Sequence, residues 1–316
     1  MLTLYNIEPV GYSEELEKLI RKHFRYIPSH DGLTEDMYAN AEIIVTRLGT
    51  QFSRATLKKF RKLKCICTPT TGLNHIDLSA ALDLSIAIVS LKGETEFLRE
   101  ITATAELTWS LILNLVRNVP KAVKSVTQGH WNRDSFIGYE LKGKQLGIIG
   151  YGRLGSIVHR YADAFGMSVV AYDPNLEEQS VSVTRVALEE LLEQSDFISL
   201  HASYSSNVGT ILPKAKLSLI KHGAYFINTA RGELVDEECL IALLTSGQLA
   251  GVALDVLSSE YDKLSDAMLS ESMLSAIEAG QNLLITPHIG GVTHDSMRNT
   301  EKFIIGKLIS KFSNVT

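Results

Sequence analysis

The sequence predicts an α/β protein with two Rossmann-like domains, each built on a parallel sheet that helices cover. Three observations support this prediction. Short apolar runs alternate with amphipathic stretches through the first hundred residues, a second series of this kind begins near Lys144, and a glycine-rich turn opens that second series. Strand–helix alternation is typical of parallel sheets. The 316 residues are enough for two separate hydrophobic cores.

The first series begins with an apolar strand and an amphipathic helix. Ser13 is a good N-cap for that helix, and Glu14 and Glu15 in its first turn interact favourably with the helix dipole. The elements that we expect in this series are strands at 1–7, 41–49, 64–72 and 86–91, and helices at 13–23 and 53–63.

A long helical pattern over residues 100–129 leads into the second series. From Leu107 to Val116 this pattern is apolar nearly all round. A helix without a polar face has to be buried. We therefore expect it to lie between the domains or against another subunit, which favours a homodimer.

The second series consists of short apolar strands separated by helical stretches, as in a sheet covered on both faces. We expect strands at 145–150, 168–173, 196–202, 224–230, 250–256 and 282–288, and a closing amphipathic helix at 292–312.

Composition and charge argue against several classes of protein. The formal net charge of −5 is spread over both signs without long runs, which gives no indication of binding to nucleic acid or to an anionic membrane. No apolar run reaches the roughly 20 residues of a membrane-spanning helix, and the first residues lack the basic end of a signal peptide. The three cysteines do not have the spacing of a metal site. We therefore expect a cytoplasmic protein without a bound metal.

The segment around Gly150 is the most specific in the chain. Gly150, Gly152 and Gly155 form G-x-G-x-x-G between an apolar strand and a helix, and Asp173 ends the following strand. In this pattern the first glycine makes a tight turn, the second lets the backbone approach a pyrophosphate, and the third lets helix and strand pack closely. The helix N-terminus favours negative phosphates. An acid at Asp173 suits the ribose hydroxyls and repels a 2′-phosphate, so the segment predicts NAD rather than NADP.

Three further segments follow this turn in order. They are FINTARGELVDEECLIALLTSGQLAGVALDV at 226–256, a glutamate shortly after it, and ITPHIGG at 285–291. Together with the glycine turn in mid-chain they resemble the D-isomer-specific 2-hydroxyacid dehydrogenase family, of the phosphoglycerate dehydrogenase and hydroxypyruvate reductase type and in a short form without a C-terminal regulatory domain. The resemblance implies an NAD-dependent oxidoreductase and a homodimer.

The resemblance also implies a division of the chain. Residues 1–99 and 292–316 would form a flavodoxin-like substrate domain, residues 100–291 would form the NAD-binding domain, and an active-site cleft would lie between them.

Hydride transfer to or from a 2-hydroxy acid needs a cation for the carboxylate and a group that exchanges the hydroxyl proton. Arg231 directly follows a strand, where α/β sheets bind ligands, and its planar fork suits a carboxylate. His288 also ends a strand, and an imidazole can accept the proton in oxidation and return it in reduction. The resemblance gives Glu260 as the carboxylate partner of His288. Because the proline-rich turn usual in the family is missing after Glu260, Asp262 stays an alternative partner.

The residues on either side of His288 also indicate the shape of the chain there. Pro287 fixes the backbone where the chain leaves the strand. We expect Gly290 and Gly291 to leave room beside His288 for cofactor or substrate.

The matching loops also indicate residues for substrate and cofactor. The backbone of Thr71, Gly72 and Leu73 could bind the substrate carboxylate, and the cation of Arg47 could meet a second anionic group. An ordinary surface role is the alternative for Arg47. The residues expected to bind the cofactor are Gly150, Gly152, Arg153, Leu154, Gly155, Asp173, His201, Ala202, Ser203, Thr229, Ala230, Arg231, Asp255, His288 and Gly290.

The predicted function is therefore the interconversion of a D-2-hydroxy acid and its 2-oxo acid. An alternative from another class is an NAD(H)-sensing binding protein, as corepressors related to this family are. Formate dehydrogenases share the pattern but have glutamine in place of the glutamate, so Glu260 speaks against them. For the substrate, 3-phosphoglycerate, hydroxypyruvate, glyoxylate and longer 2-oxo acids all stay open.

Overall fold

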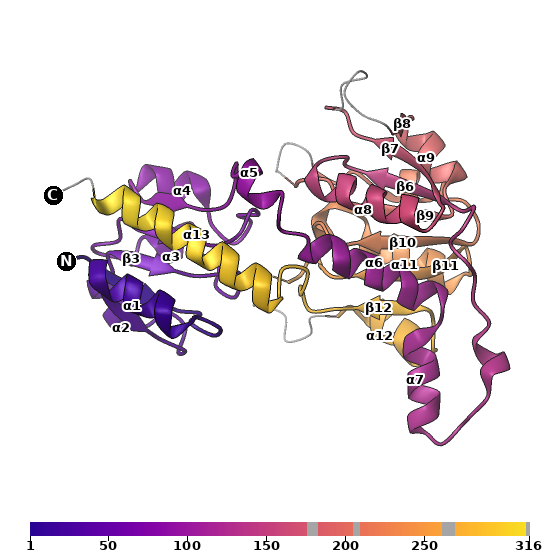
Figure 1. Cartoon of the computed structure of the whole chain (residues 1–316), viewed down its shortest axis with the longest axis horizontal. Coiled ribbons are helices and arrows are strands. Elements are labelled where there is room, and N and C mark those ends of the chain that lie inside the picture. The colour runs from indigo at the N-terminus through magenta and orange to yellow at the C-terminus, as the bar shows by residue number, and fades with distance from the viewer. Residues whose placement is uncertain (176–182, 205–208, 261–268, 314–316) are drawn as a thin grey trace. The chain divides into compact units, whose positions relative to one another are not determined.

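The computed structural model describes residues 1–175, 183–204, 209–260 and 269–313 (Figure 1). The chain divides into two compact units. Unit 1 comprises residues 1–101 and 292–316, and unit 2 comprises residues 102–291. The last helix of the chain thus belongs to the same unit as the first hundred residues.

Unit 1 is a five-stranded parallel sheet with helices packed against both faces. The strand order β2-β1-β3-β4-β5 is the flavodoxin-like order that was predicted. Alternation along β3 explains the two layers, because Ile43 and Val45 pack on the side of α1 and α13, whereas Ile44 packs on the side of α2, α3 and α4. The elements are β1 Thr3–Asn6, α1 Glu14–His23, β2 Arg25–Pro28, α2 Glu35–Asn40, β3 Ile43–Val45, α3 Arg54–Leu57, β4 Cys65–Cys67, α4 Leu78–Asp83, β5 Ala87–Val89, α5 Thr95–Leu98 and α13 His294–Ser313.

Unit 2 is a seven-stranded parallel sheet in the order β12-β11-β10-β9-β6-β7-β8. The order reverses between β6 and β9, and doubly wound sheets bind ligands beyond the carboxyl ends of the strands at this point. Helices α6 and α8 cover one face of the sheet, and α9, α11 and α12 cover the other.

The elements of unit 2 follow one another along the chain as in Figure 1. They are α6 Ala103–Val116, α7 Val119–Thr127, η1 Arg133–Phe136, β6 Gln145–Ile149, α8 Arg153–Ala164, β7 Ser168–Tyr172, β8 Thr184–Arg185, α9 Leu188–Gln194, β9 Phe197–Leu200, α10 Lys214–Leu217, β10 Ala224–Asn228, η2 Gly232–Leu234, α11 Glu237–Thr245, β11 Leu249–Leu254, α12 Glu271–Glu278 and β12 Leu283–Ile285.

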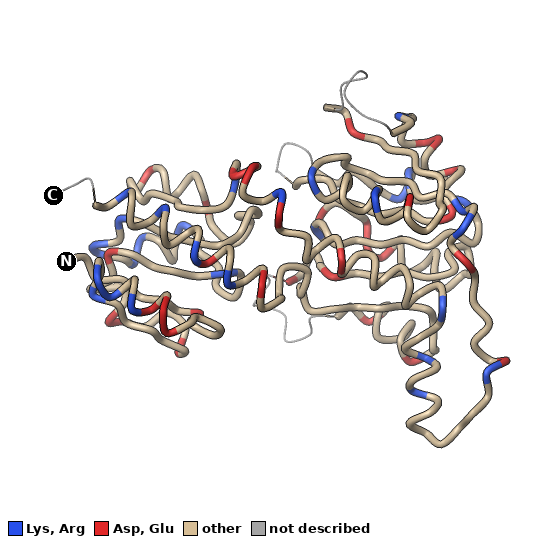
Figure 2. Tube along the Cα trace, in the orientation of Figure 1, with Lys and Arg blue, Asp and Glu red and all other residues tan. Residues whose placement is uncertain are grey.

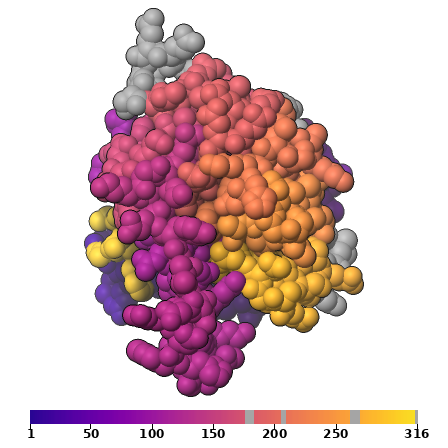
Figure 3. Space-filling model, turned by 90° about the vertical axis from the view of Figure 1, so that its right-hand side faces the viewer, coloured from indigo at the N-terminus to yellow at the C-terminus, as the bar shows by residue number. Residues whose placement is uncertain are grey.

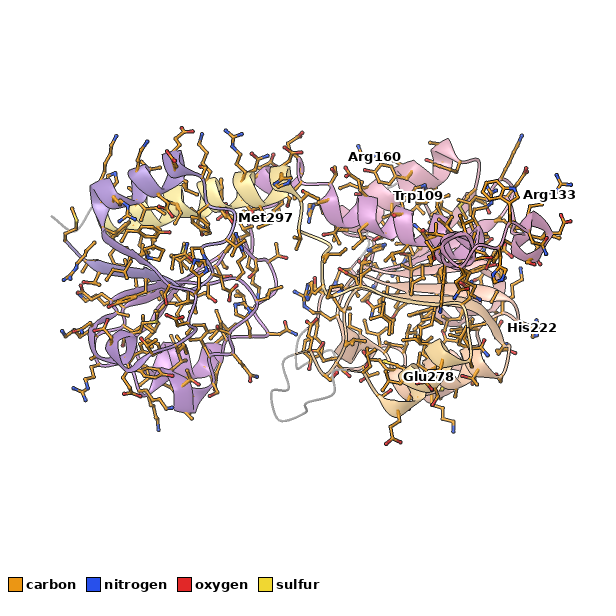
Figure 4. The ribbon with its side chains drawn as sticks, turned by 90° about the horizontal axis from the view of Figure 1, so that it is seen from below. Trp109, Arg133, Arg160, His222, Glu278 and Met297 are labelled. Carbon is orange, nitrogen blue, oxygen red and sulfur yellow. The ribbon has the colours of Figure 1, made fainter. Side chains whose placement is uncertain are left out.

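The single helix predicted over residues 100–129 is in fact two helices, α6 and α7. Asn118 between them adopts the left-handed conformation with φ of 53°, and Pro120 in the first turn of α7 suits a helix start because it lacks an N–H. Ile112 and Leu115 of α6 are fully buried within unit 2. Trp109, labelled in Figure 4 near Arg160, packs against the aromatic rings of α8 and the residue that follows it. Unit 2 alone therefore buries one face of α6, and cover of this helix by another domain or subunit stays a prediction.

Exposed apolar residues lie instead on the next segment. Residues 119–139, here called the arm, extend from the rest of unit 2 and include α7 and η1 (Figures 1 and 3). No residue of α7 is buried, and Arg133 of η1 lies at the right-hand edge of the view in Figure 4. The large apolar residues that the arm exposes are Val119, Val123, Val126, Trp131, Ile137 and Tyr139.

Two strands were not predicted, and both lie at sheet edges. β2 pairs only with β1, and β8 pairs only with β7 among the described strands. β2 ends at Pro28 and β8 spans only Thr184–Arg185, so neither has the apolar run that marks a central strand.

Charged residues of both signs are mixed along both units (Figure 2). Across the described residues, every helix is too short or too polar to span a lipid bilayer.

Candidate active site

The glycine turn follows β6 at the point where the strand order reverses. Gly150 has φ of +91°, and a Cβ on it would lie 2.5 Å from the backbone nitrogen of Ala202. A Cβ on Gly155 would lie 2.6 Å from the carbonyl oxygen of Gly150. The first and third glycines are therefore required by backbone conformation and close packing.

A glycine is present at position 152 for a different reason. It caps α8 without a side-chain hydrogen bond, and no described atom lies within 4 Å of the position that its Cβ would occupy. The space beside Gly152 at the start of α8 is therefore open, and a helix N-terminus attracts phosphate. These residues fit the pyrophosphate of a dinucleotide.

Asp173, directly after β7, is connected to the glycine turn. Its Oδ2 accepts a hydrogen bond from Tyr151 N at 3.0 Å, and its Oδ1 accepts one from Asn175 N at 2.9 Å. The hydroxyl of Tyr151 lies 2.6 Å from Nδ1 of His159 on α8. The acid expected to meet the ribose is thus held in place by the loop expected to meet the phosphates.

The segment after β9 lies close to the first glycine. Nε2 of His201 is 2.8 Å from Oγ of Ser199, and burial lowers the pKa of His201 to about 4. His201 is therefore a neutral imidazole rather than a proton donor. Ser203 is exposed, and Ser205 lies outside the described residues.

Arg231 follows β10, the strand next to β9. Asn228 fixes the turn, because its Oδ1 accepts from Ala230 N at 2.9 Å and its Nδ2 donates to Arg231 O at 2.9 Å. Thr229 Oγ1 lies 2.8 Å from Thr108 Oγ1 on α6. The guanidinium of Arg231 donates to Ala230 O at 2.6 Å and forms no ion pair with a described carboxylate.

His288 and Glu260 form an ion pair or charge-assisted hydrogen bond. Nδ1 of His288 lies 2.9 Å from Oε2 of Glu260, and both side chains are mostly buried. Because Nδ1 contacts the carboxylate, Nε2 is the ring nitrogen that can exchange a proton with a ligand. Asp262, the alternative partner, lies outside the described residues.

Asp255, at the end of β11, holds the turn that carries His288. Its carboxylate accepts hydrogen bonds from Thr286 Oγ1 at 2.6 Å, Ile289 N at 2.8 Å and Gly290 N at 2.8 Å. Its carbonyl accepts one from His288 N at 2.9 Å. Burial raises the pKa of Asp255, and these hydrogen bonds lower it. From the sequence we expected Asp255 to contact the cofactor. Nothing in the sequence indicated that it also holds the turn of His288.

The backbone of His288 itself is unusual. Its φ of 53° is left-handed, a conformation that non-glycine residues seldom adopt. Gly290 does not leave room for a ligand, because a Cβ there would meet Asp255 Oδ2 at 3.0 Å and Thr104 Cγ2 at 3.1 Å. The prediction for Gly290 is corrected in this respect, whereas the Cβ position of Gly291 is open.

The residues expected to meet the substrate follow two neighbouring strands of unit 1. Arg47 comes after β3, and Thr71, Gly72 and Leu73 come after β4. The second loop is ordered by Thr70, whose Oγ1 donates to Gly72 O at 2.9 Å. Both loops therefore lie at the same edge of the sheet.

The charge of Arg47 is already compensated. Its guanidinium forms an ion pair with Glu301 of α13 and donates to Val10 O at 2.6 Å. Glu301 is only 1% exposed, and burial raises the pKa of its carboxyl while Arg47 lowers it. Nothing in the sequence pattern brings these two residues together, since 254 positions separate them.

The strand order, the glycine turn and the acid after β7 define unit 2 as a dinucleotide-binding domain. A family model described as D-isomer specific 2-hydroxyacid dehydrogenase, NAD binding domain, matches residues 109–290, more than half of the chain. The chain belongs to this family of NAD-dependent oxidoreductases. The predicted family, fold class and NAD cofactor are confirmed.

Individual relatives agree with the family model. A D-3-phosphoglycerate dehydrogenase of Methanocaldococcus jannaschii is 34% identical over 275 residues, which cover 84% of this chain and 50% of the relative. A hydroxypyruvate reductase of Thermotoga maritima is 32% identical, covering 85% of this chain and 84% of the relative. The crystal structure of an Aquifex aeolicus D-lactate dehydrogenase with NAD and lactic acid superposes with a TM-score of 0.82 at 28% identity, covering 99% of this chain and 95% of that one. The chain thus spans about half of some relatives and most of others.

Proposed function

We propose that this protein interconverts a D-2-hydroxy acid and its 2-oxo acid, with His288 as acid/base, Glu260 as its partner and Arg231 as the carboxylate-binding cation. The observation that carries the proposal is the 2.9 Å contact between His288 Nδ1 and Glu260 Oε2. Bound NAD supplies or accepts the hydride. Residues 100–291 would bind the cofactor, and residues 1–99 with 292–316 would bind the substrate.

The roles follow from the chemistry of each side chain. Glu260 stabilises the imidazolium that forms when His288 takes the hydroxyl proton, and it fixes the ring so that Nε2 faces the ligand. Arg231 has no competing carboxylate among the described residues, so its fork can bind a substrate carboxylate and polarise the adjacent 2-oxo group. The glycine turn and Asp173 hold the cofactor.

The ion pair of Arg47 favours a substrate with one charged end. Because the carboxylate of Glu301 already neutralises Arg47, a phosphate group there would meet a carboxylate as well as a guanidinium. Hydroxypyruvate, glyoxylate and related 2-oxo acids therefore fit better than a phosphorylated substrate.

We also propose a homodimer that covers the arm. Its row of exposed apolar side chains, including Val123, Val126 and Trp131, is unusual for a free surface. Sedimentation at micromolar concentration should give a dimer, and Val123→Lys should shift it towards monomer. A wild-type monomer would refute this part of the proposal.

The oxidation of NADH by a panel of 2-oxo acids tests the function itself. The panel should include glyoxylate, hydroxypyruvate and phosphohydroxypyruvate. We expect turnover with at least one unphosphorylated acid, and its loss in Glu260→Gln. If the protein binds NADH but turns over none of them, an NAD(H)-sensing binding protein becomes the better interpretation.

A further inference from the structure

The turn that carries Glu260 is fixed at its start by the core of unit 2. Leu257 is buried among the apolar residues of that core. Glu260 N donates to Leu257 O at 3.3 Å and closes the turn. Ser258 and Ser259 lie between these two residues.

Glu237 holds the middle of this turn. It lies in the first turn of α11, directly after the N-cap Asp236. Its Oε1 accepts a hydrogen bond from Ser258 N at 2.8 Å, and its Oε2 accepts one from Ser258 Oγ at 2.8 Å. Both carboxylate oxygens of Glu237 thus bind one residue, two positions before Glu260.

Gly232 shows independently how closely the two segments approach. A Cβ on Gly232 would lie 2.0 Å from Ser258 N, 2.2 Å from Leu257 C and 2.7 Å from Glu237 Oε1. Only a glycine fits there. The residue after Arg231 therefore packs directly on the turn that carries Glu260, beside the Glu237–Ser258 contact.

The carboxylate of Glu237 is not an ordinary surface acid. Burial raises its pKa, the two hydrogen bonds from Ser258 lower it, and the neighbouring charges of Glu233 and Glu238 raise it further. A carboxylate that leaves water near other acids needs strong specific contacts to stay there. Here Ser258 provides them.

We propose that Glu237 is a positioning residue that fixes Glu260 against His288 by holding the 257–260 turn through Ser258. This inference rests on the proposed function, because it assumes that the Glu260–His288 pair does the acid/base chemistry. Without Glu237 the turn loses two hydrogen bonds at Ser258, and the carboxylate of Glu260 no longer stays at hydrogen-bond distance from the imidazole. Misplacement of about 1 Å is enough to slow an enzyme strongly.

The test compares four variants by steady-state kinetics with NADH and the best 2-oxo acid. Glu237→Ala should lower kcat about tenfold with little change in KM for NADH. Glu237→Gln should restore most of kcat, because its amide can accept from Ser258 N and donate to Ser258 Oγ. Ser258→Ala removes one of the two hydrogen bonds and should fall between wild type and Glu237→Ala.

Glu238→Ala is the matched control. Glu238 is also an acid in the first turn of α11, but it is exposed and makes no contact with Ser258. Both alanine variants lose a favourable interaction with the helix dipole, and Glu237→Ala loses the two hydrogen bonds with Ser258 as well. If Glu237 only stabilises the helix, both variants will have the same kcat, and the proposal is overturned.

The pH profile gives a second readout that a purely structural role would not move. In Glu237→Ala the imidazolium loses part of its counter-charge. Reduction of a 2-oxo acid needs protonated His288, so the alkaline limb of kcat/KM should move to lower pH. If Glu260→Gln abolishes turnover while Glu237→Ala leaves kcat and the profile unchanged, only the positioning role fails. If Glu260→Gln is fully active, the proposed function fails first.

Discussion

His288 reaches Glu260 at 2.9 Å from a left-handed backbone with φ of 53°. This conformation costs about 1–2 kcal/mol for a residue with a Cβ. Asp255 compensates by binding the residues around His288 through its carbonyl and carboxylate. The geometry of the acid/base pair therefore depends on a turn that the buried Asp255 maintains.

A variant that lacks the imidazole of His288 but keeps the turn shows the effect on catalysis without an effect on folding. Asn tolerates the left-handed region, so His288→Asn should unfold at the same denaturant concentration as wild type or a higher one. Its kcat should fall by about a hundredfold or more, because the acid/base group is gone. Stopped-flow or steady-state assays measure this. Near-normal turnover would rule out His288 as acid/base.

Asp255→Asn should weaken the turn. The amide replaces one acceptor with a donor, which then faces one of the two N–H groups of Ile289 and Gly290. An unpaired buried donor costs about 1–3 kcal/mol, and we expect this loss in the free energy of unfolding from urea titration. kcat should fall as well. A variant as stable and active as wild type would show that the turn forms without Asp255.

Asp173→Ala should change the choice of cofactor. The variant loses the acid that favours ribose hydroxyls and disfavours a 2′-phosphate, so the NAD over NADP preference in kcat/KM should fall about tenfold or more. The loop also loses the hydrogen bond from Tyr151 N. Asp163→Ala, at another acid of unit 2 that lies beside His159, is the control. The same preference in both variants would mean that the ribose lies elsewhere.

Glu301→Gln should release Arg47 and broaden the substrate range. Without the buried carboxylate, the guanidinium can bind a second anionic group. kcat/KM for phosphohydroxypyruvate relative to hydroxypyruvate should rise about tenfold. Glu94→Gln, which breaks the ion pair between Glu94 and Lys307 of the same helix α13, is the matched control. If the ratio of the two kcat/KM values is unchanged in Glu301→Gln, Arg47 does not select the substrate.

His201 should make the fold sensitive to acid. Burial lowers its pKa from 6.5 to about 4, so between these values the unfolded chain binds more protons than the folded one. The contribution to stability is complete above pH 6.5 and decreases as pH falls towards 4, by up to about 1.4 kcal/mol per pH unit. His201→Gln should have a weaker dependence in urea titrations across this range. Equal slopes for both proteins would contradict the assignment.

Several elements could be predicted from local patterns because the pattern itself sets the structure. The helix at Ser13 begins where its cap lies, since Ser13 accepts from Leu16 N. Central strands such as β6 and β10 are short apolar runs that helices cover on both faces. Strands β2 and β8 and the break at Asn118 lack such a signal. Pairing with a neighbouring strand decides the first two, and a single left-handed residue decides the break.

For the site, the sequence alone determined which chemical groups are present and at which strand ends they lie. Arg231 and His288 were chosen from residue type and position, Glu260 came from the resemblance to the family, and the glycine turn indicated NAD. Only the tertiary structure decided what these groups contact. The pairs Arg47–Glu301, Glu237–Ser258 and His288–Glu260 join positions that local periodicity cannot relate. Their charges and hydrogen bonds are determined by distance in space, and that distance exists only after the parallel sheets have brought the loops together.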